Sequence, residues 1–539
     1  MTIGIDLGTA SSSIAFLDGE KPRVIPNRFG NLSTPSVLTY DPDRGIIVGE
    51  EALKSGVSRY DRTVSSFKRR MGSSFPCRLG DRIFTPVDLS ALILQRLLKD
   101  AVRFLGQPVE AAILAVPAHF NENQRRATKE AAQKAGLSRV RLINEPTAAA
   151  LAYGSEIVGR TAVFDFGGGT LDISLLEIDS REARVRCVGG DSKLGGVDFT
   201  RIVYANIKAQ LRGRLSGMAD ARLMECAEEL KIALSAATEA ETGWTGDRIS
   251  LSRSVFEREA APLVARAERI TLDTLKKAGW TPHEVDTVIL AGGSSRIPAV
   301  AARISRLFSA AKIQRRSPGE IVALGAARAA QPADSRRSSY FEVLPYTLGL
   351  EIDGGRALQL VERNTPLPCS LRRTFTTLAD NQTSVEIHVL QGSYLNADKN
   401  SSLGRFMLSG IRSAPKGVPQ IEVDFTVDAD GLLTVKAGDR ESGVSERIVI
   451  PRITRSGSDK SRGAGHLRRL IDELQALNLR RGGLIDRELK EDIEDILAIS
   501  AESLQKQDEE RIRECIIALD TLASEVKALD HAREANRAG

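Results

Sequence analysis

The most informative stretch of the sequence is Val163-Phe-Asp-Phe-Gly-Gly-Gly-Thr-Leu-Asp172. It places two carboxylates and a hydroxyl around three glycines. Ala162 to Phe166 is predicted to form a short buried strand, with Leu171 to Ile178 as its hairpin partner. The glycines let the turn adopt positive φ and leave its N–H groups available to phosphate oxygens, while the carboxylates attract a hydrated Mg²⁺. The stretch indicates a phosphate and metal site, although for one such motif a tight hairpin with incidental acids is the simpler interpretation.

The sequence makes this turn a second time and adds a third glycine turn. Near the N-terminus, Ile3-Gly-Ile-Asp-Leu-Gly-Thr9 again ends a short apolar strand and continues into the strand-like Ser13-Ile-Ala-Phe-Leu17. Self-similarity at a large interval indicates two similar lobes that face one nucleotide. The third turn, in Val288-Ile-Leu-Ala-Gly-Gly-Ser-Ser-Arg-Ile-Pro298, lies between a predicted strand and a predicted helix, where nucleotides commonly bind. Together and in this order, the three turns favour nucleotide binding.

Composition limits the remaining classes of protein. With 539 residues, the chain exceeds what a single core normally supports, so two or three domains are expected. The net charge is +5 and no basic block is interleaved with aromatic residues, which argues against nucleic-acid binding. The five scattered cysteines lack the spacing of a zinc site or disulfide framework, as is typical of a reducing cytosol. Without a leader or a long apolar run, we expect a soluble, cytoplasmic protein with no membrane partner.

Changes in pattern divide the chain into four parts. Strands alternate with helices over residues 1–330, which predicts α/β lobes. Residues 331–343 begin with a small, polar and charged stretch that is typical of a linker. Residues 344–454 alternate with period two and predict a β-sandwich, with Asp430-Gly431 as a hairpin turn. Residues 466–539 carry helical leucine and isoleucine stripes broken by Gly482-Gly483, which predict a small bundle.

Local signals also predict individual helices. Thr85 and Pro86 open a helix that Gly106 can close, and Asn121 can cap another that runs to Gly136. A further helix, over residues 224–237, carries three polar side chains on one face at spacings of three and four. A solvated ion pair is the simplest interpretation of that face. Its polar residues are Glu228, Lys231 and Ser235.

From residue 1 to 450, the motifs resemble those of the 70-kDa heat-shock chaperone family of the DnaK type, in the family's order. They are Ile3-Gly-Ile-Asp-Leu-Gly-Thr9, Val116-Pro-Ala-His-Phe-Asn121, Ile143-Asn-Glu-Pro-Thr-Ala-Ala-Ala-Leu-Ala-Tyr-Gly154, Asp165-Phe-Gly-Gly-Gly-Thr170, Leu194-Gly-Gly-Val-Asp-Phe199, Ala291-Gly-Gly293, Asp380-Asn-Gln382, His388-Val-Leu-Gln-Gly392 and Pro419-Gln-Ile-Glu-Val423. The resemblance implies an α/β two-lobed actin-like ATPase domain, an all-β sandwich that binds peptide, and a short α-helical lid.

The resemblance also implies catalytic roles. Lys68 would neutralise charge that grows on the γ-phosphate, and Thr170 would hydrogen-bond the terminal phosphate. Glu145 and Asp165 would orient the attacking water or accept its proton. These roles suit the chemistry, because phosphoryl transfer depends on in-line positioning and charge neutralisation.

The implied ligands are ATP and ADP, with Mg²⁺ and a nearby K⁺. Asp6 and Asp172 would hold the Mg²⁺ through water. The other implied nucleotide contacts come from the glycine turns and from the polar face of the helix predicted over residues 224–237. The resemblance therefore makes a solvated ion pair a less favoured interpretation of that face. They are Gly8, Thr9, Gly167, Gly168, Gly169, Glu228, Lys231, Ser235, Gly292, Gly293 and Arg296.

For the sandwich, the resemblance implies an extended apolar polypeptide bound through its backbone. An ordinary sandwich core explains Phe375 about as well on alternation alone. Unfolded polypeptides and a J-domain co-chaperone are the implied partners, and the need for a nucleotide-exchange factor stays open. The implied peptide contacts are Phe375, Leu378, Val385 and Ile387, and the implied coupling residues are Pro117, Arg125 and Arg141, the last of which matches a J-domain contact.

The chain departs from the family pattern at several positions. Ala10 stands where the family usually has threonine, and Gly319 where it usually has aspartate. The linker, Ser338-Ser-Tyr-Phe-Glu-Val343, is less apolar than the usual leucine-rich run, although its two aromatic residues restore some area. These departures keep open an alternative, a nucleotide-sensing peptide-binding module with little useful turnover. The retained catalytic residues favour an ATP-hydrolysing chaperone, and the linker, sandwich and lid argue against an actin-like filament or a sugar kinase.

Overall fold

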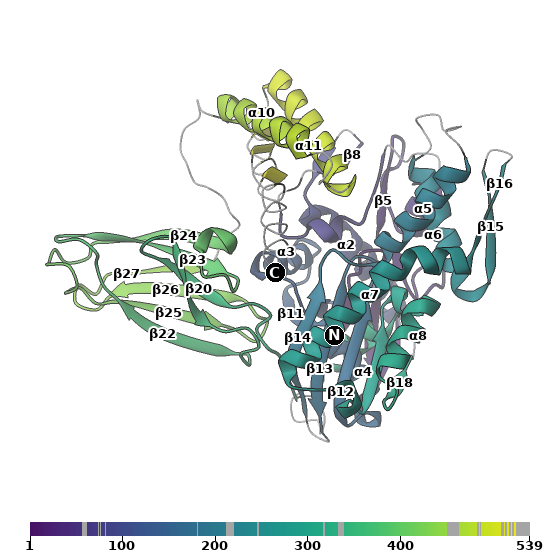
Figure 1. Ribbon diagram of the computed structural model, residues 1–539, viewed down its shortest axis with the longest axis horizontal. Helices are drawn as coiled ribbons and strands as arrows, with labels where there is room; N and C mark the ends of the chain where they lie inside the picture. The colour runs from purple at the N-terminus through teal and green to yellow at the C-terminus, as the bar shows by residue number, and fades with distance from the viewer. Residues whose placement is uncertain are drawn as a thin grey trace.

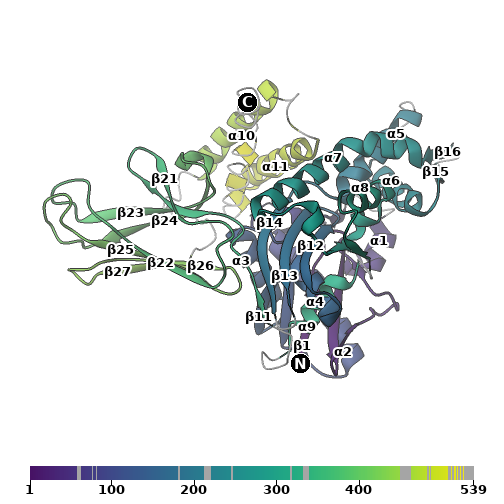
Figure 2. The same cartoon turned by 60° about the horizontal axis from the view of Figure 1, so that its bottom comes forward.

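A body of two α/β lobes carries a β-sandwich on one side and a helical segment above it in the computed structural model (Figures 1 and 2). The structure describes residues 1–56, 62–73, 75, 77–80, 82–179, 182–211, 220–244, 247–315, 319–331, 339–449, 463–481, 485 and 487–507, and then 511–512, 515–516, 519, 522–523 and 526.

The first lobe, lobe I, is built on a sheet with the strand order β11-β10-β1-β2-β3, and β4 pairs with β2. β10 pairs in parallel with β1 and with β11, and it is buried along its whole length, as expected of a strand that is covered on both faces. Helices α2 and α3 cover one of these faces. The elements are β1 (Thr2–Asp6), β2 (Ser11–Asp18), β3 (Lys21–Val24), β4 (Thr34–Pro35), β10 (Ala111–Val116), β11 (Arg139–Asn144), α2 (Pro86–Leu105) and α3 (Glu122–Lys134).

The ends of α2 and α3 follow from their local sequence. The Thr85 hydroxyl accepts the Asp88 N–H, the Asp88 carboxylate accepts the Thr85 N–H, and Gly106 closes α2 with φ of 68°. The Asn121 side chain caps α3 in the same way. The predicted ends of α2 and start of α3 are therefore confirmed, and α3 stops at Lys134, just before its predicted end.

Lobe II is built on a sheet with the strand order β18-β17-β12-β13-β14-β19. The predicted hairpin is present as β12 and β13, which pair antiparallel over eight residues, so that Asp165 lies opposite Asp172. A large core joins one face of the sheet to four helices. The elements are β12 (Gly159–Phe166), β13 (Leu171–Ile178), β14 (Glu182–Asp191), β17 (Thr287–Ala291), β18 (Lys312–Gln314), α5 (Gly196–Gln210), α6 (Asp220–Ala236), α7 (Arg253–Ala278) and α8 (Pro298–Leu307).

Two alanine-rich helices, α4 (Glu145–Tyr153) and α9 (Ile321–Arg328), share one core with strands of both lobes. Their close approach depends on glycine. A Cβ on Gly325 would lie 1.6 Å from the Ala148 carbonyl oxygen, and a Cβ on Gly4 would lie 2.1 Å from the Ala327 nitrogen. The two lobes are thus joined below the ends of β1 and β12, where the glycine turns begin.

Smaller elements complete the lobes. In lobe I, β5 pairs with β6 and β7 beside α1, and β8 forms a hairpin with β9. In lobe II, β15 and β16 form a hairpin. The elements are β5 (Val37–Asp41), β6 (Gly45–Val48), β7 (Thr63–Ser65), α1 (Glu50–Gly56), β8 (Cys77–Leu79), β9 (Arg82–Phe84), β15 (Glu239–Trp244) and β16 (Asp247–Ser252).

The β-sandwich consists of two four-stranded sheets, β21-β20-β23-β24 and β22-β25-β26-β27, around one apolar core. The predicted turn at Asp430-Gly431 connects β25 with β26, and Gly431 has φ of 77°. The strands are β20 (Leu348–Ile352), β21 (Arg356–Val361), β22 (Cys369–Phe375), β23 (Ser384–Gln391), β24 (Ser401–Ser409), β25 (Ile421–Val427), β26 (Leu433–Asp439) and β27 (Ser445–Val449).

The described part of the linker forms a strand that the sequence did not predict. β19 (Ser339–Phe341) pairs in parallel with β14 at the edge of the lobe II sheet. The Tyr340 hydroxyl accepts from Arg141 at 3.0 Å, and the Arg184 guanidinium lies 5.3 Å from the centre of the Phe341 ring. Arginine partners therefore hold an aromatic linker in place of an aliphatic one.

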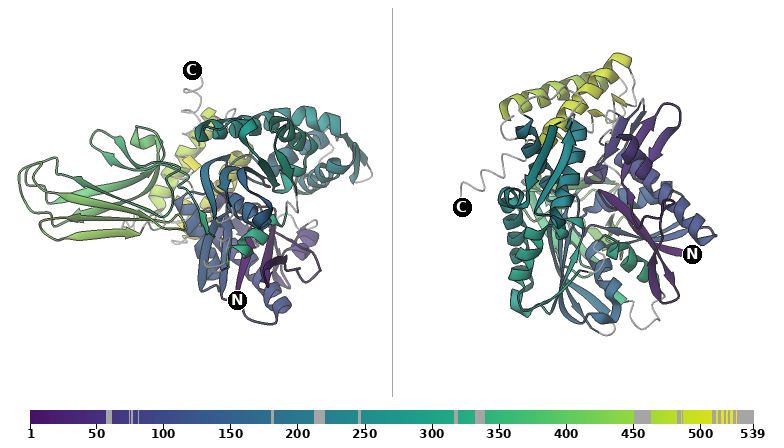
Figure 3. Two further views of the ribbon diagram at one scale, coloured as in Figure 1. Left: turned by 90° about the horizontal axis from the view of Figure 1, so that it is seen from below. Right: turned by 90° about the vertical axis from the view of Figure 1, so that its right-hand side faces the viewer.

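The helical segment, here called the lid, contains α10 (Gly463–Arg481) and α11 (Arg487–Lys506). Figure 3 shows these helices beside the α/β body from two directions. Their apolar core extends to Phe75 and Ile83 of lobe I, and Arg78 forms an ion pair with Glu502 at 3.4 Å. The predicted break at Gly482-Gly483 lies outside the described residues.

Candidate nucleotide site

Two glycine turns from opposite lobes face each other. A Cβ on Gly168 would lie 3.2 Å from the Ala10 Cβ, and a Cβ on Gly169 would lie 3.0 Å from the Thr9 hydroxyl. Larger side chains on either turn would separate the lobes. The pairing predicted from the sequence repeat is thus present in space, and its backbone N–H groups lie close to a shared space.

Both turns are closed by local contacts. The Gly167 N–H donates to the Thr170 carbonyl at 3.0 Å, which brings the Thr170 hydroxyl to the end of the turn. A Cβ on Gly8 would lie 2.1 Å from the Ser11 carbonyl oxygen, so only glycine fits there. These contacts hold the turn backbones in place without a bound phosphate.

Four carboxylates and one ammonium group lie beneath the turns. Asp6 ends β1, Glu145 begins α4, and Asp165 and Asp172 face each other across the β12–β13 hairpin. The Lys68 ammonium donates to Glu145 Oε1 at 2.8 Å. Of these residues, all except the half-buried Asp6 are buried.

Burial and mutual repulsion raise the pKa of Asp6, Glu145 and Asp165. Burial, and then the charge of Glu145, raises the pKa of Asp6 to about 7, although Lys68 opposes the shift. Burial and the other three carboxylates raise the pKa of Asp165 well above its usual value, and burial and Asp172 raise that of Glu145. Burial lowers the pKa of Lys68, but Glu145 and Asp6 more than reverse this, so it is raised overall. The four acidic groups outnumber the one ammonium group, so the cluster contains too little positive charge to balance them.

This donor set fits a hydrated divalent cation. Four acids against one base leave excess negative charge in a site shielded from water, which Mg²⁺ can neutralise while it keeps its water ligands. Within the described residues, no three acidic, histidine or cysteine side chains converge as a direct metal cage.

The polar face of α6 lies close to the Gly167–Gly169 turn, because a Cβ on Gly196 would lie 3.3 Å from the Gly168 Cα and 3.4 Å from the Lys231 ammonium. The Lys231 ammonium is buried and donates to the Gly196 carbonyl at 3.2 Å, the Thr200 hydroxyl at 3.0 Å and Glu228 at 2.6 Å. The predicted ion pair exists, but its lysine is not solvated. The Ser235 hydroxyl donates to the Lys231 carbonyl at 3.4 Å, one turn further along the helix. All three predicted residues therefore lie on one face beside the turn.

The third glycine turn lies against the end of β12 that leads into the Gly167–Gly169 turn. Gly292 has φ of 74°, and a Cβ there would lie 2.7 Å from Asp165 Oδ1. Gly293 and Arg296 are exposed, and a Cβ on Gly319 would lie 3.7 Å from the Arg296 guanidinium. The turn thus provides open backbone and one exposed cation next to the carboxylates.

Sequence reasoning assigned no role to His119 and Phe120. His119 Nδ1 lies 3.1 Å from Asp172 Oδ1, and the Phe120 ring lies 5.5 Å from the Lys68 ammonium. Both belong to the quoted motif Val116-Pro-Ala-His-Phe-Asn121. The motif therefore contained both residues, but only the fold shows that its loop in lobe I lies against lobe II.

Two of the three predicted coupling residues, Pro117 and Arg125, lie around this loop, and the third, Arg141, contacts Tyr340 of the linker. The Pro117 carbonyl accepts from Phe120 at 3.0 Å and closes the loop. The buried Arg125 side chain donates to the Phe120 carbonyl at 3.2 Å and to Asn144 Oδ1 at 2.6 Å. The Asn144 N–H in turn donates to Glu342 of the linker at 3.0 Å. Burial lowers the pKa of Arg125, and Glu342 is the largest influence that opposes the shift.

The β25–β26 turn of the sandwich docks on lobe I. Asp430 accepts from the Lys129 ammonium at 2.7 Å and from the Leu142 N–H at 3.0 Å. The Leu433 N–H donates to Glu122 at 3.0 Å. Sequence reasoning placed Asp430 only in a hairpin turn, because its partners lie about 300 residues away.

The predicted peptide contacts lie in and around the sandwich core. Ile387 is buried in it, while Phe375 and Val385 are half-buried against it. Leu378 is 66 % exposed. The core interpretation therefore accounts for Ile387, and Leu378 is the one apolar side chain of the four that is open to a ligand.

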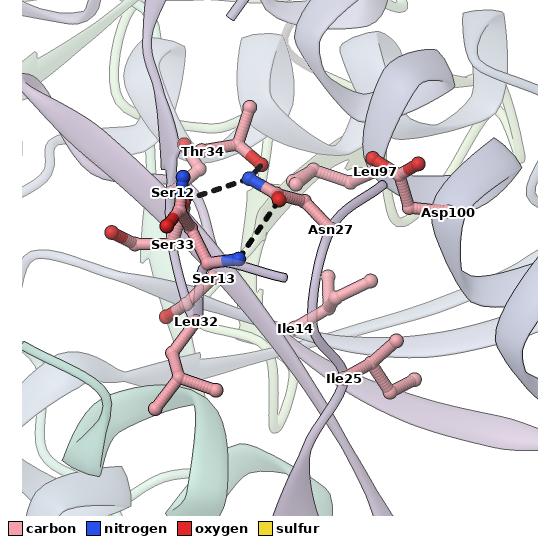
Figure 4. Close-up of a pocket in the computed structure, with 11 residues that line it drawn as sticks. Ser12, Ser13, Ile14, Ile25, Asn27, Leu32, Ser33, Thr34, Leu97 and Asp100 are labelled. Carbon is pink, nitrogen blue, oxygen red and sulfur yellow. Dashed lines mark hydrogen bonds between the residues drawn. The ribbon is translucent and has the colours of Figure 1, made fainter. Parts of the chain in front are cut away.

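A separate hollow beside β2 differs from this site. Figure 4 shows it between Ser12 and Leu97, with the Asn27 side chain across it. The Asn27 amide donates to the Ser33 carbonyl at 3.1 Å and to the Thr34 hydroxyl at 3.3 Å. Internal hydrogen bonds use the polar groups of Asn27, so this hollow is a structural feature of the loop.

The chain was compared with models of known protein families. The family model described as Hsp70 protein matches residues 2–79 and 76–536. Within the described residues, none of the helices combines the length and apolar character needed to cross a bilayer.

Proposed function

The chain belongs to the Hsp70 family, and from that premise we propose that it is an ATP-dependent molecular chaperone that alternates between fast and slow exchange of extended apolar polypeptides. One observation carries the proposal: the buried carboxylates and lysine under the glycine turns lie one loop away from a docked β-sandwich. In this proposal residues 1–330 form an actin-like nucleotide-binding domain, 331–343 the linker, 344–454 the peptide-binding sandwich and 466–539 the lid.

The proposed hydrolysis uses groups at the cleft. Lys68 donates to the γ-phosphate, and its 2.8 Å bond to Glu145 fixes its position. Asp165, whose pKa is raised by burial and by neighbouring acids, accepts the proton of the attacking water. The Thr170 hydroxyl donates to the terminal phosphate. No covalent intermediate is required, because phosphoryl transfer depends on positioning and charge neutralisation.

The proposed cofactors offset the charge of the site. When bound, Mg²⁺ neutralises negative charge on the phosphates and on the carboxylates. Asp6 and Asp172 hold it through water, and K⁺ is proposed nearby. Glu228, Lys231 and Ser235 contact the ribose and adenine, and Gly292, Gly293 and Arg296 form the opposite wall.

The docked arrangement is proposed to be the fast-exchange state. The lid core includes Phe75 and Ile83 of lobe I, and β19 is paired with β14, so both the lid and the linker are held by the nucleotide-binding domain. Loss of the γ-phosphate would weaken this docking and release the lid toward the peptide. Such a switch requires only that the domains have a docked and an undocked arrangement and that the γ-phosphate favours one of them.

A J-domain co-chaperone is proposed to use Arg141. In the docked state, Arg141 donates to the Tyr340 hydroxyl at 3.0 Å. A partner that takes this guanidinium would compete with the linker and favour undocking. This contact supports the proposal that a partner bound to Arg141 biases the switch.

Single-turnover hydrolysis and peptide release test the proposal together. ATP hydrolysis should require Mg²⁺ and accelerate when an extended leucine-rich peptide is added. A fluorescent peptide should leave the ATP-loaded protein about 5- to 150-fold faster than the ADP-loaded protein, the usual range of coupling between sites. Nucleotide-dependent release without turnover would favour the nucleotide-sensing alternative, and equal release with both nucleotides would contradict both functions.

A further inference from the structure

A tyrosine of the β-sandwich segment contacts the residue that holds a metal-site carboxylate. The Tyr346 hydroxyl donates to the His119 carbonyl oxygen at 2.7 Å, and the two rings meet edge to face with centroids 6.1 Å apart. His119 Nδ1 lies 3.1 Å from Asp172 Oδ1, and the His119 N–H donates to the same oxygen at 3.2 Å. A single residue thus separates the sandwich segment from the Asp172 carboxylate.

Three parts of the fold meet at this point. His119 follows β10 in lobe I, Asp172 lies on β13 in lobe II, and Tyr346 precedes β20 of the sandwich. Gly190 of β14 lies opposite Asp172, and a Cβ there would come within 2.7 Å of His119 Nδ1. A rotation of one lobe against the other, or of the sandwich against either, would therefore disturb this contact.

The surroundings strengthen these hydrogen bonds. The side chains of His119 and Asp172 are 13 % and 2 % exposed, so water competes little for them. Burial, and then the charge of Asp172, raises the pKa of Tyr346 to about 12, so its hydroxyl keeps the proton that it donates. When the Asp172 carboxylate is ionised it can only accept, and His119 then donates to it from Nδ1 as well as from its backbone N–H.

This contact differs from several other bonds between the domains. Glu342 bonds to Asn144, and Asp430 bonds to Lys129 and Leu142, so these contacts end on β11 and α3 of lobe I. Arg363 and Asn364 do reach lobe II, where both bond to Val188 of β14. The Tyr346 contact instead leads through one residue, His119, to the Asp172 carboxylate.

We propose that Tyr346 is a positioning residue: docking of the sandwich places Tyr346 against His119 and thereby fixes the Asp172 carboxylate for Mg²⁺. The inference rests on the proposed function and names one of the residues that couple its two sites. Coupling is reciprocal, so a contact through which docking strengthens binding of Mg²⁺ with ATP must also let Mg²⁺ strengthen docking by the same factor. Loss of one such hydrogen bond should reduce that factor by about two- to tenfold.

The test compares two tyrosine hydroxyls in the full-length protein. Tyr346→Phe removes the hydroxyl that contacts His119, and Tyr340→Phe removes the interdomain hydroxyl that accepts from Arg141. Hydrogen exchange is measured at the Val188 and Leu433 amides, which donate across the interface to Asn364 and Glu122 at 3.4 and 3.0 Å. Each protein is saturated with ATP, with and without Mg²⁺.

Mg²⁺ should increase the protection of both amides in the wild type. Tyr346→Phe should reduce this increase by about two- to tenfold, and the half-saturating Mg²⁺ concentration for a fluorescent ATP analogue should rise by the same factor. Tyr340→Phe should lower protection equally with and without Mg²⁺, which leaves the increase unchanged. His119→Asn, which keeps a side-chain donor, should retain more of the increase than His119→Ala.

The outcomes separate this inference from the proposed function. Wild-type protein that does not bind ATP with Mg²⁺ would overturn both. A normal Mg²⁺-dependent increase in the wild type that survives intact in Tyr346→Phe would overturn the positioning role alone and leave Tyr346 as a packing residue.

Discussion

The nucleotide cleft and the interface between lobe I and the sandwich both bury charged side chains, but they balance them differently. In the cleft, four carboxylates share one ammonium group. At the interface, acids and bases are equal in number, and each acid has a cationic neighbour. The cleft residues are Asp6, Lys68, Glu145, Asp165 and Asp172, and the interface pairs are Glu122 with Arg126, Asp430 with Lys129, and Glu342 with Arg125.

This difference separates a site that needs a ligand from a surface that is already complete. Buried charge without a partner is costly, so the cleft is stabilised when a cation binds. At the interface, Arg126 of the same helix neutralises Glu122, while Asp430 of the sandwich and Glu342 of the linker offset the charges of Lys129 and Arg125 in lobe I. In this protein, an excess of buried negative charge therefore indicates a ligand-binding site, whereas balanced buried charge indicates a surface that docks against another domain.

The largest expected effect comes from removal of Lys68, the cation that lies among the cleft carboxylates. Lys68→Ala should slow single-turnover ATP hydrolysis by about 10²- to 10³-fold, because a donor to the transition state is lost and the acids lose their internal counter-charge. Quenched-flow measurement of ADP formation gives the rate. Lys54→Ala, at an exposed lysine of α1, is the matched control and should hydrolyse ATP at the wild-type rate. Equal rates in both variants would contradict the assignment of the cleft.

A smaller effect is expected when the charge balance of the interface between lobe I and the sandwich is removed. Asp430→Ala removes the acceptor of two hydrogen bonds and leaves Lys129 without its ion-pair partner. Docking should weaken by about 1.5–3 kcal/mol, which is about 10- to 150-fold. Hydrogen exchange at the Leu142 amide measures the change. Asp398→Asn, at an exposed acid of the same sandwich, should leave that amide protected, and equal protection in Asp430→Ala would show that the interface does not depend on this charge.

The interface should also depend on pH through Glu122. Burial raises its pKa from 4.5 to about 7, although Arg126, the Leu433 N–H and Arg125 oppose the shift. The docked state then holds the proton more tightly than the undocked state, so docking is strongest at low pH, weakens as the pH rises toward 7 and changes little above that.

The radius of gyration from small-angle scattering of nucleotide-free protein should therefore rise between about pH 5 and 7. Glu122→Gln, which keeps an acceptor for the Leu433 N–H but cannot titrate, should flatten the profile. A profile of the same shape in both proteins would assign the pH dependence to another group.

The smallest effect is expected at the linker. Phe341→Ala removes the ring that lies under Arg184, which should accelerate hydrogen exchange in β19 by about two- to fivefold, as expected for an exposed cation–π contact of about 0.5–1 kcal/mol. Phe29, which is similarly exposed and lies 4.8 Å from the Arg28 guanidinium, provides the control on lobe I. Phe29→Ala should not change exchange in β19.

Local features were accessible to sequence reasoning because their causes are local. The ends of α2 follow from Thr85 and Gly106, and the β12–β13 hairpin follows from alternating apolar residues around three glycines. The repeated turn also indicated that two lobes face each other. In contrast, nothing near β19 in sequence predicted that it would pair with a strand about 150 residues away.

The sequence by itself determined the strands, the capped helices and the acids and glycines of the cleft, because capping, periodicity and turn geometry act over a few residues. Only the tertiary structure decided that His119 lies between Asp172 and Tyr346, since the fold must bring together residues 53 and 227 positions apart. Such contacts depend on how whole sheets and domains pack. Their polar side chains show no pattern until both partners are buried at one interface.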